Sequence, residues 1–320
     1  MTLIGHDDAW QQWRTALAGE RMHHAWMLTG RSGLGKMQFA HQAARELVAE
    51  PGTTQPAGHH PDIHILQRLP KDEKEEKKQA DGKPFDSKRN ITVAQIRAMQ
   101  QRLNTRPTLG SRRAIIIDPS DDLEKGASNA LLKSLEEPPI GTFFLLITHR
   151  PARLLPTIRS RCRIVRFPVV SDEELAFFLS REAPDANPAT RQAAIVAASG
   201  SPGAALDFVD RDLGTLFSLM QSIVREGDPD FQHRGRLSEA IGARPNRDRI
   251  QATIDLARSV LAGTTSDAAK AGYPALVDAH AELVKLGSQA PMYNFDPGLL
   301  IAEIGTLLAS AAPPRDRANV

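Results

Sequence analysis

The chain has 320 residues, of which 41% are hydrophobic, so it is long enough for two or three domains and has the composition of an ordinary soluble protein. Its net charge of +2 excludes nucleic-acid binding through whole-chain charge, and its single cysteine, Cys162, excludes a disulfide framework and a cysteine-based zinc site. With no apolar run of membrane-span length and a polar amino-terminal segment, the chain is expected in the cytoplasm.

The first predicted elements are a helix, a strand, a loop and a second helix. Residues 6–18 carry apolar side chains at helical spacing, and residues 25–28 form a short apolar run typical of a buried strand. That run leads into Gly30-Arg31-Ser32-Gly33-Leu34-Gly35-Lys36-Met37, and a helix is predicted over residues 36–49. A glycine-rich loop between a strand and a helix is typical of a phosphate-binding loop, whose backbone NH groups and Lys hold phosphates.

This loop departs from the pattern G-x-x-x-x-G-K-[ST] at its last position. The Ser or Thr hydroxyl of that pattern binds magnesium, and Met37 has no hydroxyl. A tight turn that binds nothing is the structural alternative, and the flanking strand and helix argue against it. We therefore predict a degenerate nucleotide site at residues 30–37, without efficient hydrolysis of ATP.

The following region is polar. Residues 51–58 are rich in Pro, Gly and Thr, and residues 71–78 carry four Lys and four acidic residues. We expect both stretches to be mobile loops, and the balanced charge of the second favours a solvated loop over a hairpin that faces DNA. Between them lie His59, His60, Asp62 and His64, which have metal-binding side chains but are predicted to lead into a strand over residues 63–66 without binding a metal.

Strands and helices then alternate. A helical period over residues 91–103 precedes an apolar run over 114–117, a helix over 127–137 that Pro138 ends, a second apolar run over 143–148 and a short strand over 164–167. Continuous apolar runs are typical of strands that are buried on both faces of a sheet. The pattern predicts a layered α/β domain with a mostly parallel sheet.

Asp118 follows the first of those apolar runs directly. Lys36 of the loop and this acid at a strand tip are the expected pair for phosphate and magnesium. The next residue, Pro119, cannot polarise an attacking water. Asp121 and Asp122 are better suited to capping the next helix than to replacing that base.

Beyond Pro168 the pattern is helical. Ser171 and Glu174 form a predicted capping box, and Asn187-Pro188 and Ser201-Pro202 each indicate the start of another helix. Residues 213–310 are helical again, with breaks predicted near residues 226–230, 263–266 and 288–296.

Four segments in order carry a family resemblance: the glycine-rich loop, residues 115–118 (Ile-Ile-Ile-Asp), residues 128–139 (Ser-Asn-Ala-Leu-Leu-Lys-Ser-Leu-Glu-Glu-Pro-Pro) and residues 158–162 (Ile-Arg-Ser-Arg-Cys). Together they resemble the clamp-loader branch of the AAA+ ATPases, and within it the delta-prime family of bacterial DNA polymerase III subunits. The resemblance is sharp over residues 3–208 and thin afterwards, where residues 294–308 are similar to the last collar helix of that family.

The resemblance implies an α/β AAA+ P-loop domain followed by an all-α lid and an all-α collar. The implied boundaries are a base over residues 1–168, a three-helix lid over 169–211, a collar for oligomerisation over 212–312 and a disordered tail over 313–320. The implied partners are gamma/tau motor subunits and a delta subunit in a hetero-pentameric ring, with the sliding clamp and primed DNA contacted through that assembly. The ring would be part of a DNA polymerase holoenzyme.

The resemblance also assigns roles to single residues. Thr148 falls at the first sensor position, beside His149, although a hydroxyl that merely ends a strand explains it equally well. Gly203 stands where active relatives carry the Arg of the second sensor. Together with Met37 and Pro119, three parts of the hydrolytic machinery are missing. Weak or structural binding of ATP or ADP is favoured, and binding as such stays open.

Arg161 is the residue expected to act. The Arg of the family's Ser-Arg-Cys segment reaches the γ-phosphate held by a neighbouring subunit, a task that suits a planar, permanently charged guanidinium. The surrounding arginines are expected to form a solvated basic face, and Cys162 to be a small buried side chain. The expected function is therefore a stator-like clamp-loader subunit that supplies an arginine finger in trans. A gamma/tau-type motor that hydrolyses ATP is the alternative, and an independent nucleotide kinase is weaker because it shares only the loop.

Overall fold

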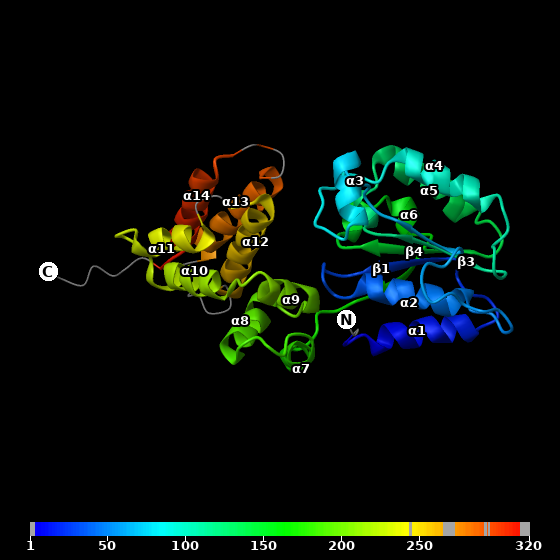
Figure 1. Cartoon of the computed structure of the whole chain (residues 1–320), viewed down its shortest axis with the longest axis horizontal. Coiled ribbons are helices and arrows are strands. Elements are labelled where there is room, and N and C mark those ends of the chain that lie inside the picture. Colours follow the sequence, from blue (N-terminus) through cyan, green and yellow to red (C-terminus); the bar gives the residue numbers. More distant parts are fainter. Residues whose placement is uncertain (1–3, 243–244, 265–272, 291–292, 294, 314–320) are drawn as a thin grey trace. The chain divides into compact units, whose positions relative to one another are not determined.

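The computed structural model describes residues 4–242, 245–264, 273–290, 293 and 295–313. The chain divides into two compact units, Met1–Val169 and Val170–Val320. Figure 1 shows that strands and helices build the first unit and that helices build the described part of the second. This confirms the predicted fold class, an α/β domain followed by all-helical structure.

The first unit is built on a five-stranded sheet with strand order β2-β3-β4-β1-β5, in which every neighbouring pair is parallel. Every residue of β1 and β3 is buried, which explains the apolar runs over residues 25–28 and 114–117. The strands are β1 (Ala25–Thr29), β2 (Ile63–Leu66), β3 (Arg113–Ile117), β4 (Thr142–Thr148) and β5 (Arg163–Arg166).

Helices cover both faces of this sheet (Figure 1). Helices α1 (Asp7–Ala18) and α2 (Lys36–Val48) pack on one face in a core cluster that includes Trp13 and Trp26, whose rings lie 5.2 Å apart. On the other face lie α4 (Val93–Leu103), α5 (Lys125–Glu136) and the short α6 (Pro156–Arg159). The sheet is therefore sandwiched between two apolar cores.

The predicted mobile loop at residues 71–78 is wrong, because helix α3 (Glu73–Ala80) forms there. Asp72 caps the helix by accepting a hydrogen bond from the Glu75 backbone NH at 3.0 Å. The buried Glu75 carboxylate then accepts hydrogen bonds from Lys78 Nζ and from the Asp86 backbone NH, each at 2.7 Å. The balanced charge of residues 71–78 thus serves local pairing.

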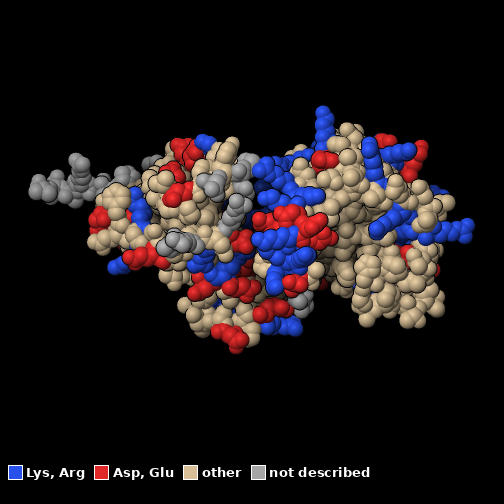
Figure 2. Space-filling model, turned by 45° about the horizontal axis from the view of Figure 1, so that its top comes forward, with Lys and Arg blue, Asp and Glu red and all other residues tan. Residues whose placement is uncertain are grey.

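On the face shown in Figure 2, basic side chains lie beside acidic ones and form no single basic patch.

The second unit begins with three helices at the predicted caps. Ser171, Asn187 and Ser201 each accept a hydrogen bond from the backbone NH three residues on, at the starts of α7 (Asp172–Glu182), α8 (Pro188–Ala198) and α9 (Pro202–Asp210). The further helices are α10 (Gly214–Glu226), α11 (Gln232–Ile241), α12 (Arg247–Thr264), α13 (Tyr273–Gln289) and α14 (Pro297–Ser310).

One break in this second series was not predicted. Helix α11 ends at Ile241, and Gly242 after it has a φ of 97°, a conformation that glycine adopts without strain. Residues 263 and 264 of the break predicted over 263–266 still belong to α12, and the rest of that break lies outside the described residues, as does the disordered tail predicted over 313–320 except for residue 313. Among the helices that are described, none combines the length and the apolar character needed to cross a membrane.

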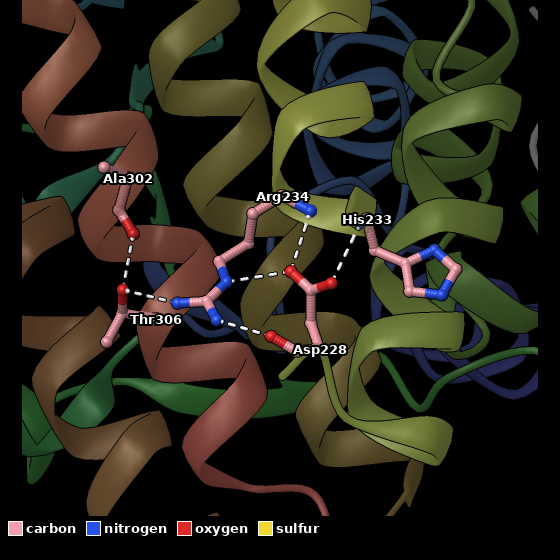
Figure 3. A network of polar contacts seen from close by, with 5 residues as sticks. All are labelled: Asp228, His233, Arg234, Ala302 and Thr306. Atoms are coloured by element: carbon pink, nitrogen blue, oxygen red, sulfur yellow. Dashed lines mark hydrogen bonds and ion pairs between the residues drawn. The ribbon is translucent and has the colours of Figure 1, made fainter. Parts of the chain in front are cut away.

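A buried polar network joins α11 to α14 (Figure 3). Asp228 has a fully buried side chain and accepts hydrogen bonds from the backbone NH groups of His233 and Arg234 at 3.0 Å and from Arg234 Nε at 2.8 Å. The same guanidinium donates to the Asp228 carbonyl at 2.7 Å and to Thr306 Oγ1 at 3.4 Å. A single carboxylate therefore fixes the start of α11 and, through Arg234, its packing on α14.

Candidate functional site

The glycine-rich loop joins β1 to α2 at the carboxyl edge of the sheet. Gly33 and Gly35 have φ values of 79° and 78°, in the region that favours glycine. At Gly30 an added Cβ would lie 2.5 Å from the carbonyl oxygen of Phe167, so no larger residue fits this approach. The backbone therefore needs glycine at these positions to make the loop.

Lys36 closes the loop on itself. Its side chain is buried, and Nζ donates hydrogen bonds to the carbonyl oxygens of Gly30, at 2.6 Å, and of Arg31. Burial lowers the pKa of Lys36 to about 8, against the opposing charges of Asp118 and Asp121. A phosphate that binds here would replace the carbonyl oxygens as partner of the ammonium group.

The other side chains of the loop differ in their exposure. Arg31 and Ser32 are exposed, whereas Leu34 is buried and its carbonyl oxygen accepts a hydrogen bond from His6 Nε2 at 2.8 Å. Met37 packs against the core cluster of α1, α2 and the sheet. Its position thus contributes packing where a magnesium-binding hydroxyl stands in the complete motif. His6 is a contact that the sequence did not reveal, because nothing in its local pattern points to the loop.

Asp118 follows β3 and is half-buried at the same edge of the sheet. Burial raises its pKa, while a 3.4 Å hydrogen bond from Gln67 Nε2 and the charges of His149 and Lys36 oppose that shift. The structure therefore brings Asp118 and Lys36 within electrostatic reach of each other. The Asp118–Pro119 peptide bond is cis.

Asp121 does not cap the next helix, so this prediction is wrong. Its carboxylate accepts hydrogen bonds from the Thr148 hydroxyl, from the His149 backbone NH at 2.6 Å and from the Arg150 backbone NH at 3.1 Å. The carboxylate thus holds the end of β4.

Asp122 does not cap that helix either. Its carboxylate lies 3.4 Å from Arg68 Nε. The residue before α5 is Glu124, whose side chain instead accepts a hydrogen bond from the Val93 backbone NH at the start of α4. The two acids after Pro119 are therefore engaged with other segments of the chain.

Thr148 and His149 lie beside the loop. Thr148 is fully buried at the end of β4, and its carbonyl oxygen accepts a hydrogen bond from the Gly30 NH at 3.3 Å. Burial and the charge of Lys36 lower the pKa of His149, while a hydrogen bond with the Gly30 backbone and nearby acids oppose the shift. His149 therefore contacts the loop as a mainly neutral ring near neutral pH. The signal for His149 in the sequence is its place beside Thr148, the predicted first sensor.

Arg161 lies at the end of the sheet where the parallel strands begin, opposite the end where the glycine-rich loop lies. Strands β1 and β5 pair in parallel, with Trp26 beside Arg163 and Thr29 beside Arg166. Gly30 follows the carboxyl end of β1, whereas Arg161 precedes the amino end of β5. The two sites are thus separated by the length of the four-residue β5, about 13 Å.

The guanidinium of Arg161 is half-exposed and held by three groups. It forms an ion pair of 2.8 Å with Glu136 Oε1, donates to the Thr157 carbonyl oxygen at 3.0 Å and lies 3.5 Å from Ser160 Oγ. Glu136 belongs to the Ser-Leu-Glu-Glu-Pro-Pro segment. Two of the segments that carry the family resemblance therefore meet at this edge.

The other predicted features are distributed as follows. Gly203 is the second residue of α9 in the second unit. Burial raises the pKa of the Cys162 thiol to about 12, so the thiolate nucleophile does not form near neutral pH. Arg150, Arg153, Arg163 and Arg166 are exposed, while Arg159 is half-exposed.

The histidine-rich segment does not converge on one point. His60 Nε2 lies 2.7 Å from Gln55 Oε1, and Asp62 accepts hydrogen bonds from the backbone NH groups of Thr108 and Leu109 at 2.6 and 2.8 Å. In the described ranges of the chain, no group of three or more His, Cys, Asp or Glu side chains is placed to hold a metal ion. Asp62 thus anchors a loop, and the prediction that no zinc binds stays a prediction.

Comparison with known proteins gives a consistent result. The family model described as DNA polymerase III, delta subunit, matches residues 5–171. The chain is 33% identical to DNA polymerase III subunit delta′ of Pseudomonas aeruginosa and 31% identical to that of Escherichia coli, each over 208 residues and 60% of this chain. These alignments span 58% and 56% of the two relatives, less than two thirds of their length.

A solved structure shares the fold over nearly the whole chain. A DNA polymerase III gamma subunit-related protein from Thermotoga maritima superimposes with a TM-score of 0.52 and 18% identity, covering 94% of this chain and 98% of that one. At this identity the likeness concerns the fold alone.

Proposed function

The chain belongs to the DNA polymerase III delta-subunit family, and on that premise we propose that it is a delta-prime-type, stator-like subunit of a clamp loader. In this role it helps to load the sliding clamp on primed DNA. Its own chemical contribution is to present Arg161 to ATP bound by a neighbouring motor subunit.

The observation that carries this proposal is the separation of Arg161 from the loop of its own chain. The two stand at opposite edges of one parallel sheet, about 13 Å apart along β5. A nucleotide held by Gly30 to Lys36 is therefore beyond the reach of Arg161 of the same chain. Arg161 precedes the amino end of β5 and its side chain is half-exposed, as action on a neighbouring subunit requires.

The proposed chemistry is stabilisation of charge during phosphoryl transfer. A water oxygen bonds to the γ-phosphorus of ATP, the bond from that phosphorus to the bridging oxygen of ADP breaks, and the proton of the water passes to a base of the motor subunit. The charge that develops on the γ-phosphoryl oxygens is met by the guanidinium. Arginine fingers supplied in trans contribute a factor of about 10³ to 10⁵ in rate.

The chain's own nucleotide site supports a poor or inactive ATPase. Met37 packs into the core, Pro119 follows the strand-tip acid, and the Asp121 carboxylate is already held by three donors. Gly203 has no charged side chain at the position where the resemblance places the arginine of the second sensor. Lys36 and the loop NH groups keep the chemistry to hold ATP or ADP weakly or structurally, with Asp118 and Thr148 beside them.

The proposed assembly is a hetero-pentameric ring with gamma/tau motor subunits and a delta subunit, in which clamp and primed DNA are contacted through the whole complex. In this chain residues 1–168 form the base, residues 169–211 the lid and residues 212–312 the collar that joins the ring. No resident zinc is required for this role.

The second candidate is an ATP-hydrolysing motor of the gamma/tau type, which the retained Lys36 and glycine loop favour. It predicts intrinsic ATP turnover that is lost in Lys36→Ala. The stator role predicts negligible turnover by the purified chain with or without that substitution, so a phosphate-release assay separates the two.

The main test is reconstitution with candidate motor and delta subunits from the same organism. We expect Arg161→Ala to co-assemble and to lose the share of clamp- and DNA-stimulated ATP turnover that comes from the adjacent site. Arg153→Ala, which removes an exposed arginine that precedes this segment, should keep that turnover. Unchanged stimulation of ATP turnover with Arg161→Ala would show that Arg161 is not an arginine finger. Failure of the unmodified chain to co-assemble would contradict the clamp-loader role itself.

A further inference from the structure

We propose that Glu136 is the positioning residue for Arg161: it holds the guanidinium in the orientation in which it meets the neighbour's phosphate. This inference rests on the proposed function of Arg161. It concerns a residue that acts only through Arg161 and that makes no contact with the nucleotide itself.

The contacts define two sides of the guanidinium. One terminal nitrogen is paired with Glu136 Oε1 at 2.8 Å, and the other donates to the Thr157 carbonyl oxygen at 3.0 Å. A guanidinium has five N–H donors in a planar fork, so these two contacts leave donors for phosphate oxygens. The carboxylate and a phosphate can therefore be bound by the same group at the same time.

Glu136 is attached to a rigid support. It is the last residue of α5, and its neighbour Leu135 is buried in the core. The Leu135 carbonyl oxygen accepts a 2.9 Å hydrogen bond from His24 Nε2, in the segment that leads into β1. The end of α5 is thus tied to the sheet on which Arg161 also depends, through β5.

The exposure of this ion pair argues for a role other than stability. The side chains of Arg161 and Glu136 are 36% and 49% exposed, and ion pairs in such positions add little to folding. What the pair does is restrict a long side chain with many rotamers before its ligand arrives. Orientation that is fixed in advance lowers the barrier of the chemical step more than it changes binding.

The test uses the reconstituted assembly with saturating clamp and primed DNA, and measures ATP turnover as kcat and KM. We expect Glu136→Gln to lower kcat at the adjacent site about three- to tenfold with KM unchanged, because part of the orientation is kept by Thr157. Glu136→Asp, which keeps the charge, should recover part of that loss. Glu137→Gln is the matched control, a neighbouring exposed carboxylate that should leave kcat unchanged.

A double mutant separates this inference from the function on which it rests. In the Arg161→Ala background, Glu136→Gln should have no further effect, because Glu136 acts only through the guanidinium. If Arg161→Ala lowers turnover but Glu136→Gln leaves it unchanged or raises it, the positioning role is wrong and the arginine finger stands. A loss that persists in the Arg161→Ala background, or a ring that no longer assembles in both Glu136 variants, would also overturn the positioning role. If Arg161→Ala has no effect, both proposals fall.

Discussion

The hydroxyl of Thr148 donates a hydrogen bond to the carboxylate of Asp121, and this contact joins the end of β4 to the turn that follows β3. The same carboxylate receives the backbone NH groups of His149 and Arg150. The polar residues after Pro119 thus hold together the carboxyl edge of the sheet. In the proposed stator, this end of the sheet keeps its structure but lacks the groups that activate water for hydrolysis.

Removal of Asp121 should therefore destabilise the first unit. Asp121→Ala leaves the Thr148 hydroxyl and the His149 NH without their acceptor, and we expect a loss of about 1 to 3 kcal/mol in the free energy of unfolding. Asp122→Ala, which removes only the half-buried partner of the exposed Arg68, should cost less than about 1 kcal/mol. Urea unfolding followed by tryptophan fluorescence measures both, since Trp10, Trp13 and Trp26 all lie in the first unit. Equal losses in the two variants would contradict this role of Asp121.

Nucleotide affinity should fall as the pH rises through about 8. The buried Lys36 ammonium has its pKa lowered to about 8, and only its protonated form attracts phosphate. A bound polyphosphate would raise that pKa, so binding takes up a proton in this range and weakens by up to about tenfold per pH unit above it. Calorimetry with ADP from pH 6.5 to 9.5 checks the sign. Affinity that is independent of pH would mean that Lys36 does not hold the phosphates.

Gly30 should tolerate no side chain. In Gly30→Ala the new Cβ would meet the Phe167 carbonyl oxygen at 2.5 Å, and the backbone would have to shift at the junction of β1 and the loop. We expect a loss of about 1 to 3 kcal/mol in unfolding free energy. Gly58→Ala is the control, because a Cβ there meets nothing within 4 Å. A Gly30→Ala protein as stable as the control would argue against this close approach.

The buried Asp228 should matter most in the second unit. Asp228→Ala leaves the Arg234 guanidinium without its carboxylate, and breaking such a buried pair costs about 3 to 5 kcal/mol. Asp255→Ala, which removes the exposed partner of Arg258 on α12, should cost less than about 1 kcal/mol. Thermal unfolding followed by circular dichroism compares the two variants. If they melt together, the network of Figure 3 does not hold α11 on α14.

The same network should weaken in acid. Burial alone would raise the pKa of Asp228, but hydrogen bonds from Arg234 and His233, together with the charge of Arg234, hold it below its ordinary value. Its contribution to stability is therefore complete above the ordinary pKa of Asp, near about 4, and is lost as the pH falls below that value. Asp228→Ala should flatten this acid limb of the stability curve.

Much of the fold could be predicted because its elements depend on residues that are close together in the sequence. The apolar run that ends at Asp118 and the glycine loop before Lys36 each need only a few neighbouring residues to specify their structure. The caps at Ser171 and Asn187 act over three residues, so they are visible in the sequence. The fold class followed from such segments.

Contacts between distant segments could not be predicted in this way. Asp121 and Thr148 are 27 residues apart, and only the parallel pairing of β3 with β4 brings them together. The balanced charge of residues 71–78 predicts a solvated loop, whereas in α3 the Glu75 carboxylate becomes buried by pairing with Lys78 and the Asp86 backbone NH. Likewise, the pairing of Glu136 with Arg161 depends on where α5 ends relative to β5.

The loop and Arg161 lie at opposite ends of the parallel strands, so the two ends of the sheet carry different chemical groups. In the proposed assembly, a molecule with a cation at one end of the sheet and a phosphate cradle at the other would associate head to tail, and such heterologous contacts generate rings when the rotation closes. A two-fold symmetric pair would not satisfy both edges. In the proposed ring, a subunit that does not hydrolyse ATP itself would still serve as the last member, since its neighbour would need only its Arg161.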